Sequence, residues 1–273
     1  MADWDSLRRD RTLFADDAAL VLDKPAGIAV TGERHDTDLV RLAADAGQTL
    51  YPAHRIDKVT SGAVLFAREL RHHGDLTRQF NRRTISKAYL AATPTTGLPE
   101  WGVIDLPLSV GRKSRVRIAA ERDRIHSDNH RWSVAPSDVF DHVRTYPSVT
   151  TFATVWADER HTLLVVRPVT GRRHQIRVHL AWIGHQLAGD PLFDRTGDAD
   201  RTLLHSWLLA FDAAWLGGRR IEVRATPGED FWAPLGGGLP GVDSLLAAAE
   251  RRLAPLSGLV TDVPVDEQAL SED

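Results

Sequence analysis

One short stretch of the chain, residues 54–62, places an acidic side chain between two cations. Its carboxylate, Asp57, is flanked by Arg55 and Lys58, and a Ser-Gly pair after it predicts a turn before an apolar strand. An aspartate is ionised at neutral pH and can act as a nucleophile or stabilise positive charge, and neighbouring cations favour the anion. Such a carboxylate suits attack on a sugar carbon.

Two other uses of Asp57 remain open on the residues alone. The carboxylate could cap the turn and form a salt bridge to Arg55 or Lys58, which is the commoner role of an aspartate in a loop. It could also be the nucleophile of a sugar-processing hydrolase. Such hydrolases normally use two carboxylates, and no second carboxylate stands in a comparable motif. The basic segments of the chain would also have no role in a hydrolase.

Two further motifs can be read beside the Asp57 loop. Residues 86–90 place Tyr89 in a strand-like run after Lys87. Residues 167–180 contain a Thr-Gly turn followed by closely spaced basic side chains, which are Arg172, Arg173, His174 and Arg177. The ordinary alternatives are a packed strand tyrosine and surface arginines that contribute little.

These three motifs, in this order, resemble the RluA-type family of RNA pseudouridine synthases. Residues 21–27 are similar to the family's opening strand and its Lys-Pro-Ala-Gly turn, and the resemblance covers most of the chain. The resemblance implies that Asp57 is the catalytic aspartate. It implies that Tyr89 packs on the target base, with its hydroxyl a candidate for removing the C5 proton, and that Arg177 pairs with the catalytic carboxylate.

The function implied by this resemblance is isomerisation of uridine to pseudouridine in ribosomal or transfer RNA. The target nucleotide would leave its stack, at a cost of a few kcal/mol, and no cofactor is expected. Whether Asp57 attacks C1′, attacks C6 or assists a glycal-like intermediate is left open, as is the modified uridine. The residues expected to contact RNA are Arg55, Lys87, Arg172, Arg173 and His174.

A non-catalytic RNA-binding or RNA-chaperone protein with the same fold is the main alternative. The joint presence of Asp57, Tyr89 and Arg177 argues against it. In a protein without catalytic activity, mutations would not be expected to leave all three motifs intact.

Composition is ordinary for a soluble globular protein: of 273 residues, 42% are hydrophobic and 26% charged. The absence of cysteine excludes disulfides, zinc-cysteine sites and thiol catalysis. The formal net charge is −3, but arginines gather in residues 68–87, 112–124 and 167–177, as contact with phosphate requires. The histidines of residues 174–185 do not form an i, i+4 pair, so no metal is expected.

The protein is expected to be cytoplasmic, to act as a monomer and to have no membrane partner. Charged side chains are spread through the first thirty residues, so we expect no apolar core of a signal peptide there. No later run approaches the length needed to cross a bilayer.

Hydrophobic patterning predicts an α+β protein with an extended mixed or antiparallel central sheet and flanking helices. The family resemblance implies that this sheet belongs to the pseudouridine synthase fold, with a catalytic cleft. Strands are predicted at residues 19–23, 63–67, 85–92, 151–156, 161–166, 203–211 and 220–225. Helices are predicted at residues 38–46, 70–83, 174–183 and 242–253, the first of them capped by Asp36 or Thr37. The tryptophans expected in the core are Trp101, Trp132, Trp156, Trp182 and Trp207.

We expect residues 1–255 to form a single catalytic domain and residues 256–273 to be a disordered acidic tail. About a dozen residues precede the first matched motif, so no N-terminal S4-type domain is expected. The polar, histidine-rich stretch 122–147 has no confident counterpart in the family, and we expect it to contribute to the choice of substrate.

Overall fold

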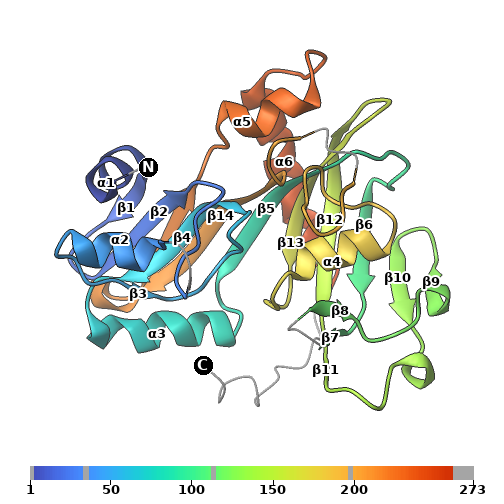
Figure 1. The fold of residues 1–273 in the computed structure, drawn as a ribbon, viewed down its shortest axis with the longest axis horizontal. Helices are drawn as coiled ribbons and strands as arrows, with labels where there is room; N and C mark the ends of the chain where they lie inside the picture. The colour runs from blue at the N-terminus through green and yellow to red at the C-terminus, as the bar shows by residue number, and fades with distance from the viewer. Residues whose placement is uncertain (1–2, 33–36, 112–114, 196–198, 261–273) are drawn as a thin grey trace. The chain divides into compact units, whose positions relative to one another are not determined.

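The computed structural model describes residues 3–32, 37–111, 115–195 and 199–260 (Figure 1). The chain divides into two compact units. Unit 1 comprises Met1–Lys87 and Leu204–Glu229, and unit 2 comprises Ala88–Leu203 and Asp230–Asp273. The single catalytic domain expected over residues 1–255 stays a prediction. Most of the expected tail, residues 261–273, lies outside the described residues.

Unit 1 is built on a mixed sheet. Its strands follow the order β1 (Thr12–Ala15), β2 (Ala19–Lys24), β4 (Ser61–Ala67) and β14 (Leu204–Ala213). The strand β15 (Arg219–Arg224) pairs with β14, and the short β3 (Tyr51–Pro52) pairs with β4. These pairs are antiparallel except β4 with β14, which is parallel. The strands predicted for this part of the chain are therefore confirmed.

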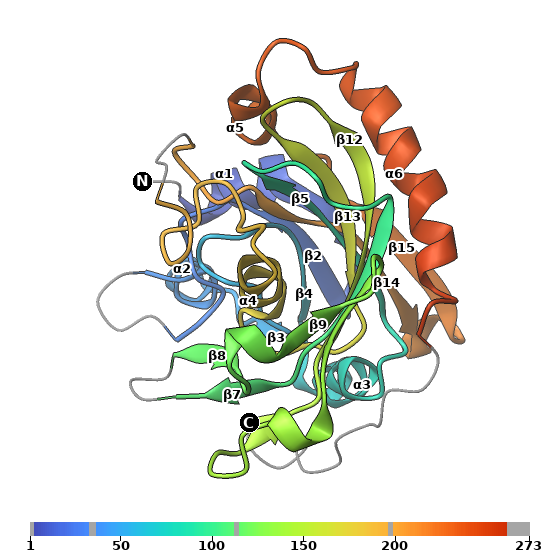
Figure 2. The ribbon, with the colours of Figure 1, turned by 90° about the vertical axis from the view of Figure 1, so that its right-hand side faces the viewer.

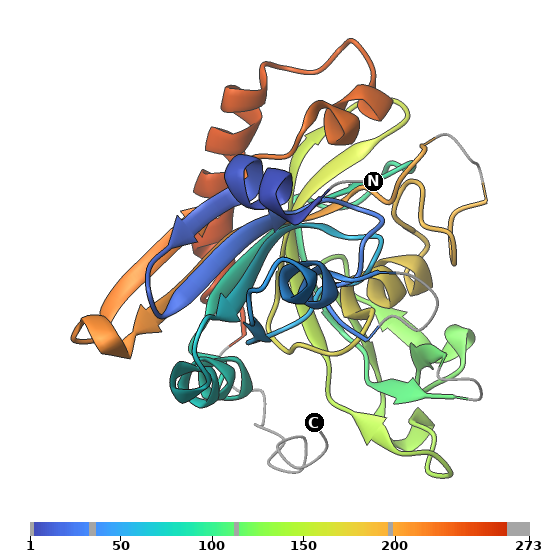
Figure 3. The ribbon, with the colours of Figure 1, turned by 60° about the vertical axis from the view of Figure 1, so that its left-hand side comes forward.

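Side chains alternate between the two faces of this sheet, as the two-residue repeat of a strand requires. On one face Val21, Leu65 and Phe211 share a hydrophobic core with Leu76 and Phe80 of α3 (Leu70–Asn81). The amphipathic helix predicted over residues 70–83 is thereby confirmed. The helices α1 (Trp4–Arg11) and α2 (Leu39–Asp45) also belong to unit 1, and α1 contacts β2 (Figure 3).

The cap of α2 differs from the prediction. The Asp38 carboxylate accepts a hydrogen bond from the backbone N–H of Arg41 at 2.9 Å. A capping side chain must directly precede the first helical residue to reach this amide, so Thr37 is one residue too early. The other expected cap, Asp36, lies outside the described residues.

Unit 2 contains a second run of paired strands. The order is β5 (Ser86–Thr93, which begins in unit 1), β13 (Thr162–Pro168), β12 (Val149–Ala157), β6 (Trp101–Asp105), β10 (Arg131–Val134) and β9 (Ile125–Ser127). All of these pairs are antiparallel except β6 with β10. A separate small sheet contains β11 (Thr145–Tyr146), β7 (Leu108–Val110) and β8 (Val116–Ile118). The strands predicted at residues 151–156 and 161–166 are confirmed as β12 and β13, which pair as an antiparallel hairpin.

Two helices pack on opposite faces of the β12 and β13 pair (Figures 1 and 2). These are α4 (Gln175–Trp182), which also contacts β8, and α6 (Val242–Leu256). The short α5 (Glu229–Trp232) precedes α6, and 3₁₀ turns lie at Arg122–Arg124, Pro136–Asp138, Ala214–Leu216 and Ala233–Leu235. Mixed sheets with flanking helices confirm the predicted α+β class.

The structure corrects the predicted environment of the tryptophans. Of the five expected in the core, Trp207 is 2% exposed, whereas Trp101 is 36% exposed and the other three are half-buried. Trp101 lies at the start of β6 and stacks on His130, with ring centroids 4.2 Å apart. An indole ring can cover the end of a strand while one of its faces remains exposed to solvent. The apolar residues next to a tryptophan in the sequence do not distinguish this partial burial from full burial.

The Ser-Gly pair after Asp57 is not the predicted turn, because Ser61 and Gly62 are the first residues of β4. Gly62 has φ +105°, and a Cβ there would lie 2.3 Å from the carbonyl oxygen of Ser206. Glycine is needed because β14 approaches the backbone of β4 too closely for any side chain.

Gly62→Ala is expected to lower the free energy of unfolding by roughly 2–4 kcal/mol, from the clash together with backbone strain. Chemical denaturation measures the change. Gly217→Ala is the matched control, because Gly217 also has positive φ, +68°, but nothing within 4 Å of an added Cβ. Backbone strain alone makes that change cost about 1 kcal/mol. Equal losses in the two variants would contradict the role given to the close approach.

Candidate active site

Asp57 lies half-buried in the loop that joins β3 to β4. The backbone N–H of Thr60 donates to the carbonyl oxygen of Asp57 at 3.0 Å and closes a turn over residues 57–60. The N–H of Gly27 donates to the carbonyl oxygen of Lys58 at 2.8 Å. The loop is thus tied to itself and to the turn after β2, and its carboxylate is carried on a fixed backbone.

The side chain of Lys24 also links the turn after β2 to the loop of Asp57. Its side chain is fully buried, and Nζ donates to the carbonyl oxygens of Pro25 at 2.9 Å, Ile28 at 2.7 Å and Lys58 at 3.3 Å. Burial of an ammonium group is costly unless it is well bonded, so these carbonyls are held in place around it. Sequence reasoning placed Lys24 in a turn and missed this role. The available signal was a lysine that ends an otherwise apolar strand.

His54 fixes the start of the same loop. Its Nε2 accepts a hydrogen bond from the backbone N–H of Leu65 at 3.1 Å, and its ring stacks on Phe80 with centroids 4.3 Å apart. Burial, together with the positive charge of Lys87, lowers the pKa of His54 to about 3. The imidazole is therefore neutral at physiological pH and positions the loop without moving protons.

A buried hydroxyl and imidazole join the beginning of β4 to β14. The Oγ of Ser61 lies 2.7 Å from Nδ1 of His205, whose Nε2 lies 2.9 Å from the carbonyl oxygen of Ala225. Because Nε2 must carry the proton to reach that carbonyl, Nδ1 accepts from the Ser61 hydroxyl. Ser61 is 4% exposed and His205 2% exposed, so this pair is a support for the loop and not a nucleophile.

Tyr89 lies on β5 in unit 2, opposite Val166 of β13. Its neighbours in the strand, Ala88 and Leu90, are buried, whereas Tyr89 is half-buried. Since side chains alternate along a strand, the phenol ring points to the less covered face of the sheet. The strand predicted over residues 85–92 is confirmed.

Arg177 lies in α4 and makes a bidentate ion pair with Asp190. Its Nε donates to Oδ2 at 2.7 Å and its Nη2 to Oδ1 at 2.8 Å, and the two side chains are 4% and 0% exposed. The backbone N–H of Leu192 donates to the same carboxylate at 2.9 Å. Two parallel hydrogen bonds fix the plane of the guanidinium. Sequence reasoning missed the part of Asp190 in holding Arg177.

The expected pairing of Arg177 with Asp57 stays a prediction. Asp57 belongs to unit 1 and Arg177 to unit 2, and each is described within its own unit.

The turn before α4 is closed by the side chain of Gln175. Its Oε1 accepts from the hydroxyl of Thr170 at 2.6 Å and from the backbone N–H of Arg172 at 3.0 Å. Its Nε2 donates to the carbonyl oxygen of Val149 at 2.9 Å and to the hydroxyl of Thr150 at 3.0 Å. The predicted helix over residues 174–183 is confirmed, with His174 as its N-cap in the left-handed region at φ 54°.

His179 extends this network into the core. It is fully buried, its Nδ1 lies 2.9 Å from the hydroxyl of Thr150 and its Nε2 lies 3.0 Å from the carbonyl oxygen of Leu106. The carbonyl requires the proton on Nε2, so Nδ1 accepts from Thr150. Burial lowers the pKa of His179 to about 4, although the hydrogen bond to Leu106 opposes that shift. The ring is neutral and structural.

The free energy of unfolding is expected to fall as the pH is lowered from 6.5 to 4. In that interval an unfolded chain protonates His179, whereas the folded protein, with a pKa of about 4, does not. The loss attributable to this group is about 3 kcal/mol. Denaturant titrations at several pH values measure it, and His179→Gln, which keeps one donor and one acceptor, should reduce the dependence by this amount and leave the part that arises from His54. Parallel pH profiles for the two proteins would contradict this origin of acid sensitivity.

The residues expected to contact RNA lie at several places. Arg55 and Arg173 are exposed, whereas Lys87, Arg172 and His174 are half-buried. The guanidinium of Arg172 lies over the ring of Tyr146, 5.2 Å from its centroid, and that of Arg144 lies 5.1 Å from the same centroid. Tyr146 belongs to the stretch 122–147, which is not a loose insertion but supplies β9, β10 and β11.

Over the described ranges, no three histidine, aspartate or glutamate side chains are grouped so that they could hold a metal ion. No helix in the described part of the chain is both long and apolar enough to cross a bilayer.

Comparisons with known proteins agree on one family. A family model described as RNA pseudouridylate synthase matches residues 18–182. The chain is 34% identical over 217 residues to Ribosomal large subunit pseudouridine synthase D of Nitrosomonas europaea, covering 73% of this chain and 57% of that protein. It is 30% identical over 205 residues to Dual-specificity RNA pseudouridine synthase RluA of Escherichia coli, covering 72% of this chain and 84% of that protein.

Solved structures share the fold. Human RNA Pseudouridylate Synthase Domain Containing 4 aligns with a TM-score of 0.66 at 22% identity, covering 85% of this chain and 94% of that chain. Human RNA Pseudouridylate Synthase Domain Containing 1 aligns with a TM-score of 0.63, also at 22% identity, covering 88% and 94%. These likenesses confirm the fold expected from the sequence.

Proposed function

Because the chain belongs to the RNA pseudouridylate synthase family, of the RluA type, and is therefore an enzyme of the isomerase class, we propose that it converts specific uridines of ribosomal or transfer RNA to pseudouridine with Asp57 as nucleophile. Tyr89 stacks on the extruded uracil, and Arg177 orients the Asp57 carboxylate. The observation that carries the proposal is the loop of Asp57, held in place by the buried Lys24.

The reaction balances without a cofactor. The bond between C1′ and N1 of the uridine breaks, and a bond between C1′ and C5 forms. C5 loses a proton and N1 gains one, so nothing is oxidised or reduced. What the protein must supply is a carboxylate of fixed position, a surface on which the detached uracil can turn, and a proton acceptor. Asp57 serves the first need, and the half-buried ring and hydroxyl of Tyr89 suit the other two.

We propose that the RNA partner is ribosomal RNA, with transfer RNA as the second choice. The relative from Nitrosomonas europaea is named for the large ribosomal subunit, whereas the one from Escherichia coli is named as dual-specificity. The chain spans little more than half the length of the first of these. Arg55, Arg172 and Arg173, with Lys87 and His174, are proposed to contact the RNA backbone or unstacked bases. We further propose a monomer that acts in the cytoplasm.

Carbodiimide mapping of pseudouridine tests the function directly. Unmodified ribosomal and transfer RNA are incubated with the protein, and reverse-transcription stops that depend on the protein name the substrate and the modified position together. Stops in neither pool, from folded protein that binds RNA in a salt-sensitive way, would instead support a non-catalytic RNA-binding or chaperone role.

A further inference from the structure

We propose that a cavity at the C-terminal end of α4 binds one unstacked nucleotide of the RNA substrate, other than the uridine that is modified. The inference takes one premise from the proposed function, namely that the protein binds RNA. The cavity has a volume of about 310 Å³, at the lower end of the range of small-ligand sites. It is lined by Arg122, Ala181, Trp182, Gln186, Leu192, Phe193 and Arg195, all in unit 2.

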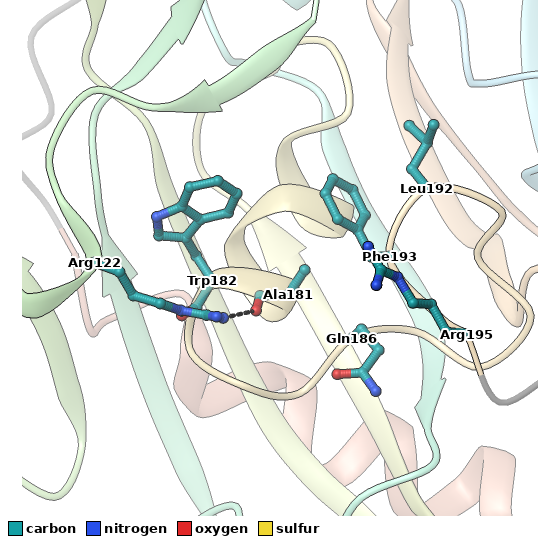
Figure 4. Close-up of a pocket in the computed structure, with 7 residues that line it drawn as sticks. All are labelled: Arg122, Ala181, Trp182, Gln186, Leu192, Phe193 and Arg195. Atoms are coloured by element: carbon teal, nitrogen blue, oxygen red, sulfur yellow. Dashed lines mark hydrogen bonds between the residues drawn. The ribbon is translucent and has the colours of Figure 1, made fainter.

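One wall of the cavity is Arg122 together with Trp182 (Figure 4). The Nη2 of Arg122 donates to the carbonyl oxygen of Ala181 at 2.6 Å, and its Nε donates to that of Trp182 at 3.1 Å. Its guanidinium carbon lies 5.8 Å from the centroid of the Trp182 ring. The arginine therefore satisfies the last carbonyls of the helix and places positive charge beside a half-buried indole.

The opposite wall is the loop that carries Phe193 and Arg195 (Figure 4). The backbone N–H groups of Phe193 and Asp194 donate to the carbonyl oxygen of Asp190 at 3.1 and 2.8 Å. The residue whose carboxylate holds Arg177 thus also anchors this wall. Arg195 is exposed and has no hydrogen-bond or ion-pair partner among the residues that the structure describes.

The lining chemistry fits a nucleotide. Two aromatic rings offer surfaces for a base, and stacking on such rings is how unstacked bases of RNA are recognised. Arg195 offers a forked donor to a phosphate, and the amide of Gln186 can donate to and accept from a base edge. None of the lining residues is acidic, so an anionic ligand is favoured over a cation.

The cavity is separate from the groups proposed to perform the reaction, because Asp57, Tyr89 and Arg177 do not line it. It receives Arg122 from the stretch 122–147, for which a part in substrate choice was expected. A neighbouring nucleotide held here would select the uridine by its sequence context.

Nucleotide binding tests the cavity without reference to catalysis. Saturation-transfer NMR would be recorded with the four ribonucleoside 5′-monophosphates, with inorganic phosphate as competitor. Transfer to base protons is expected, and Phe193→Leu combined with Arg195→Gln should raise the dissociation constant about tenfold, because a stacking surface and a phosphate contact are both weakened. Arg251→Gln, which removes an exposed arginine of α6, is the control and should change nothing.

Three results would overturn the proposal. These are an absence of transfer, equal binding by the double variant and the wild type, and complete displacement by equimolar inorganic phosphate, which would indicate a simple anion site. Arg195→Gln alone, which changes an exposed side chain, provides a second variant if the first is unstable. It should weaken binding of the monophosphates severalfold because the phosphate contact is lost, and an unchanged melting temperature shows that it is folded.

Pseudouridine mapping with the same double variant separates this inference from the proposed function. The KM for RNA should rise about tenfold while kcat is unchanged, since only binding of a neighbouring nucleotide is affected. The log-log salt slope of RNA binding should become shallower by about 0.7 for the lost arginine. If the wild type binds nucleotides but forms no pseudouridine, the proposed function is wrong and the cavity assignment stands. If the double variant forms pseudouridine with an unaltered KM, only the cavity assignment is wrong.

Discussion

Asp57→Asn is expected to lower the rate of pseudouridine formation by at least about 10³-fold, because removal of a nucleophile typically eliminates more than 4 kcal/mol of transition-state stabilisation. The amide has nearly the shape of the carboxylate, so the loop anchored by Thr60, Gly27 and Lys24 should keep its conformation. RNA affinity should therefore change little. Single-turnover assays on the RNA identified by carbodiimide mapping give the rate, and filter binding gives the affinity.

A matched control is available within unit 1. Asp45, at the end of α2, is an exposed carboxylate, and Asp45→Asn should leave both rate and affinity at wild-type values. If Asp57→Asn kept more than a tenth of the wild-type rate, the carboxylate would not be the nucleophile. A fall in RNA affinity parallel to the fall in rate would instead assign Asp57 to substrate binding.

Asp190→Asn is expected to lower the free energy of unfolding by about 3–5 kcal/mol, because it removes the charge of the carboxylate that holds the buried guanidinium of Arg177 through two hydrogen bonds. The wild-type pair is bidentate and its side chains are 4% and 0% exposed, so solvent cannot compensate. The variant should also lose pseudouridine synthase activity, since Arg177 is no longer oriented. Urea denaturation measures the first effect and carbodiimide mapping the second.

The ion pair between Arg201 and Asp230, of which the carboxylate side is exposed, provides the comparison. Its shortest distance is 2.6 Å, but the Asp230 side chain is 62% exposed. Asp230→Asn should therefore cost less than about 1 kcal/mol. Similar losses in the two variants would show that burial does not determine the contribution of the Asp190 pair.

Much of the fold follows from patterns that the sequence displays openly. Apolar runs with β-branched residues gave β2, β4, β12 and β13, and the spacing of Leu76 and Phe80 gave α3. These predictions succeed because burial of one strand or helix face depends mainly on local periodicity. The family resemblance rested on motifs, and the comparisons support it independently.

What could not be predicted depends on contacts between distant parts of the chain. Nothing near Gly62 shows that Ser206, more than a hundred residues later, approaches its backbone. Likewise Lys24 appears as the polar end of a strand until Ile28 and Lys58 are folded around its ammonium group. Asp190 becomes the partner of Arg177 only when the loop after α4 returns to that helix. Such roles are set by tertiary structure and leave no periodic signal.

The stretch 122–147 contacts α4 at its C-terminal end and the residues just before its N-terminal end. Arg122 bonds the last carbonyls of the helix, and Tyr146 receives the guanidinium of Arg172 just before its first turn. We therefore expect a substitution in this stretch to disturb the position of the helix that carries Arg177. With the roles proposed for the stretch and for Arg177, a change in substrate preference would then be accompanied by a change in catalytic rate.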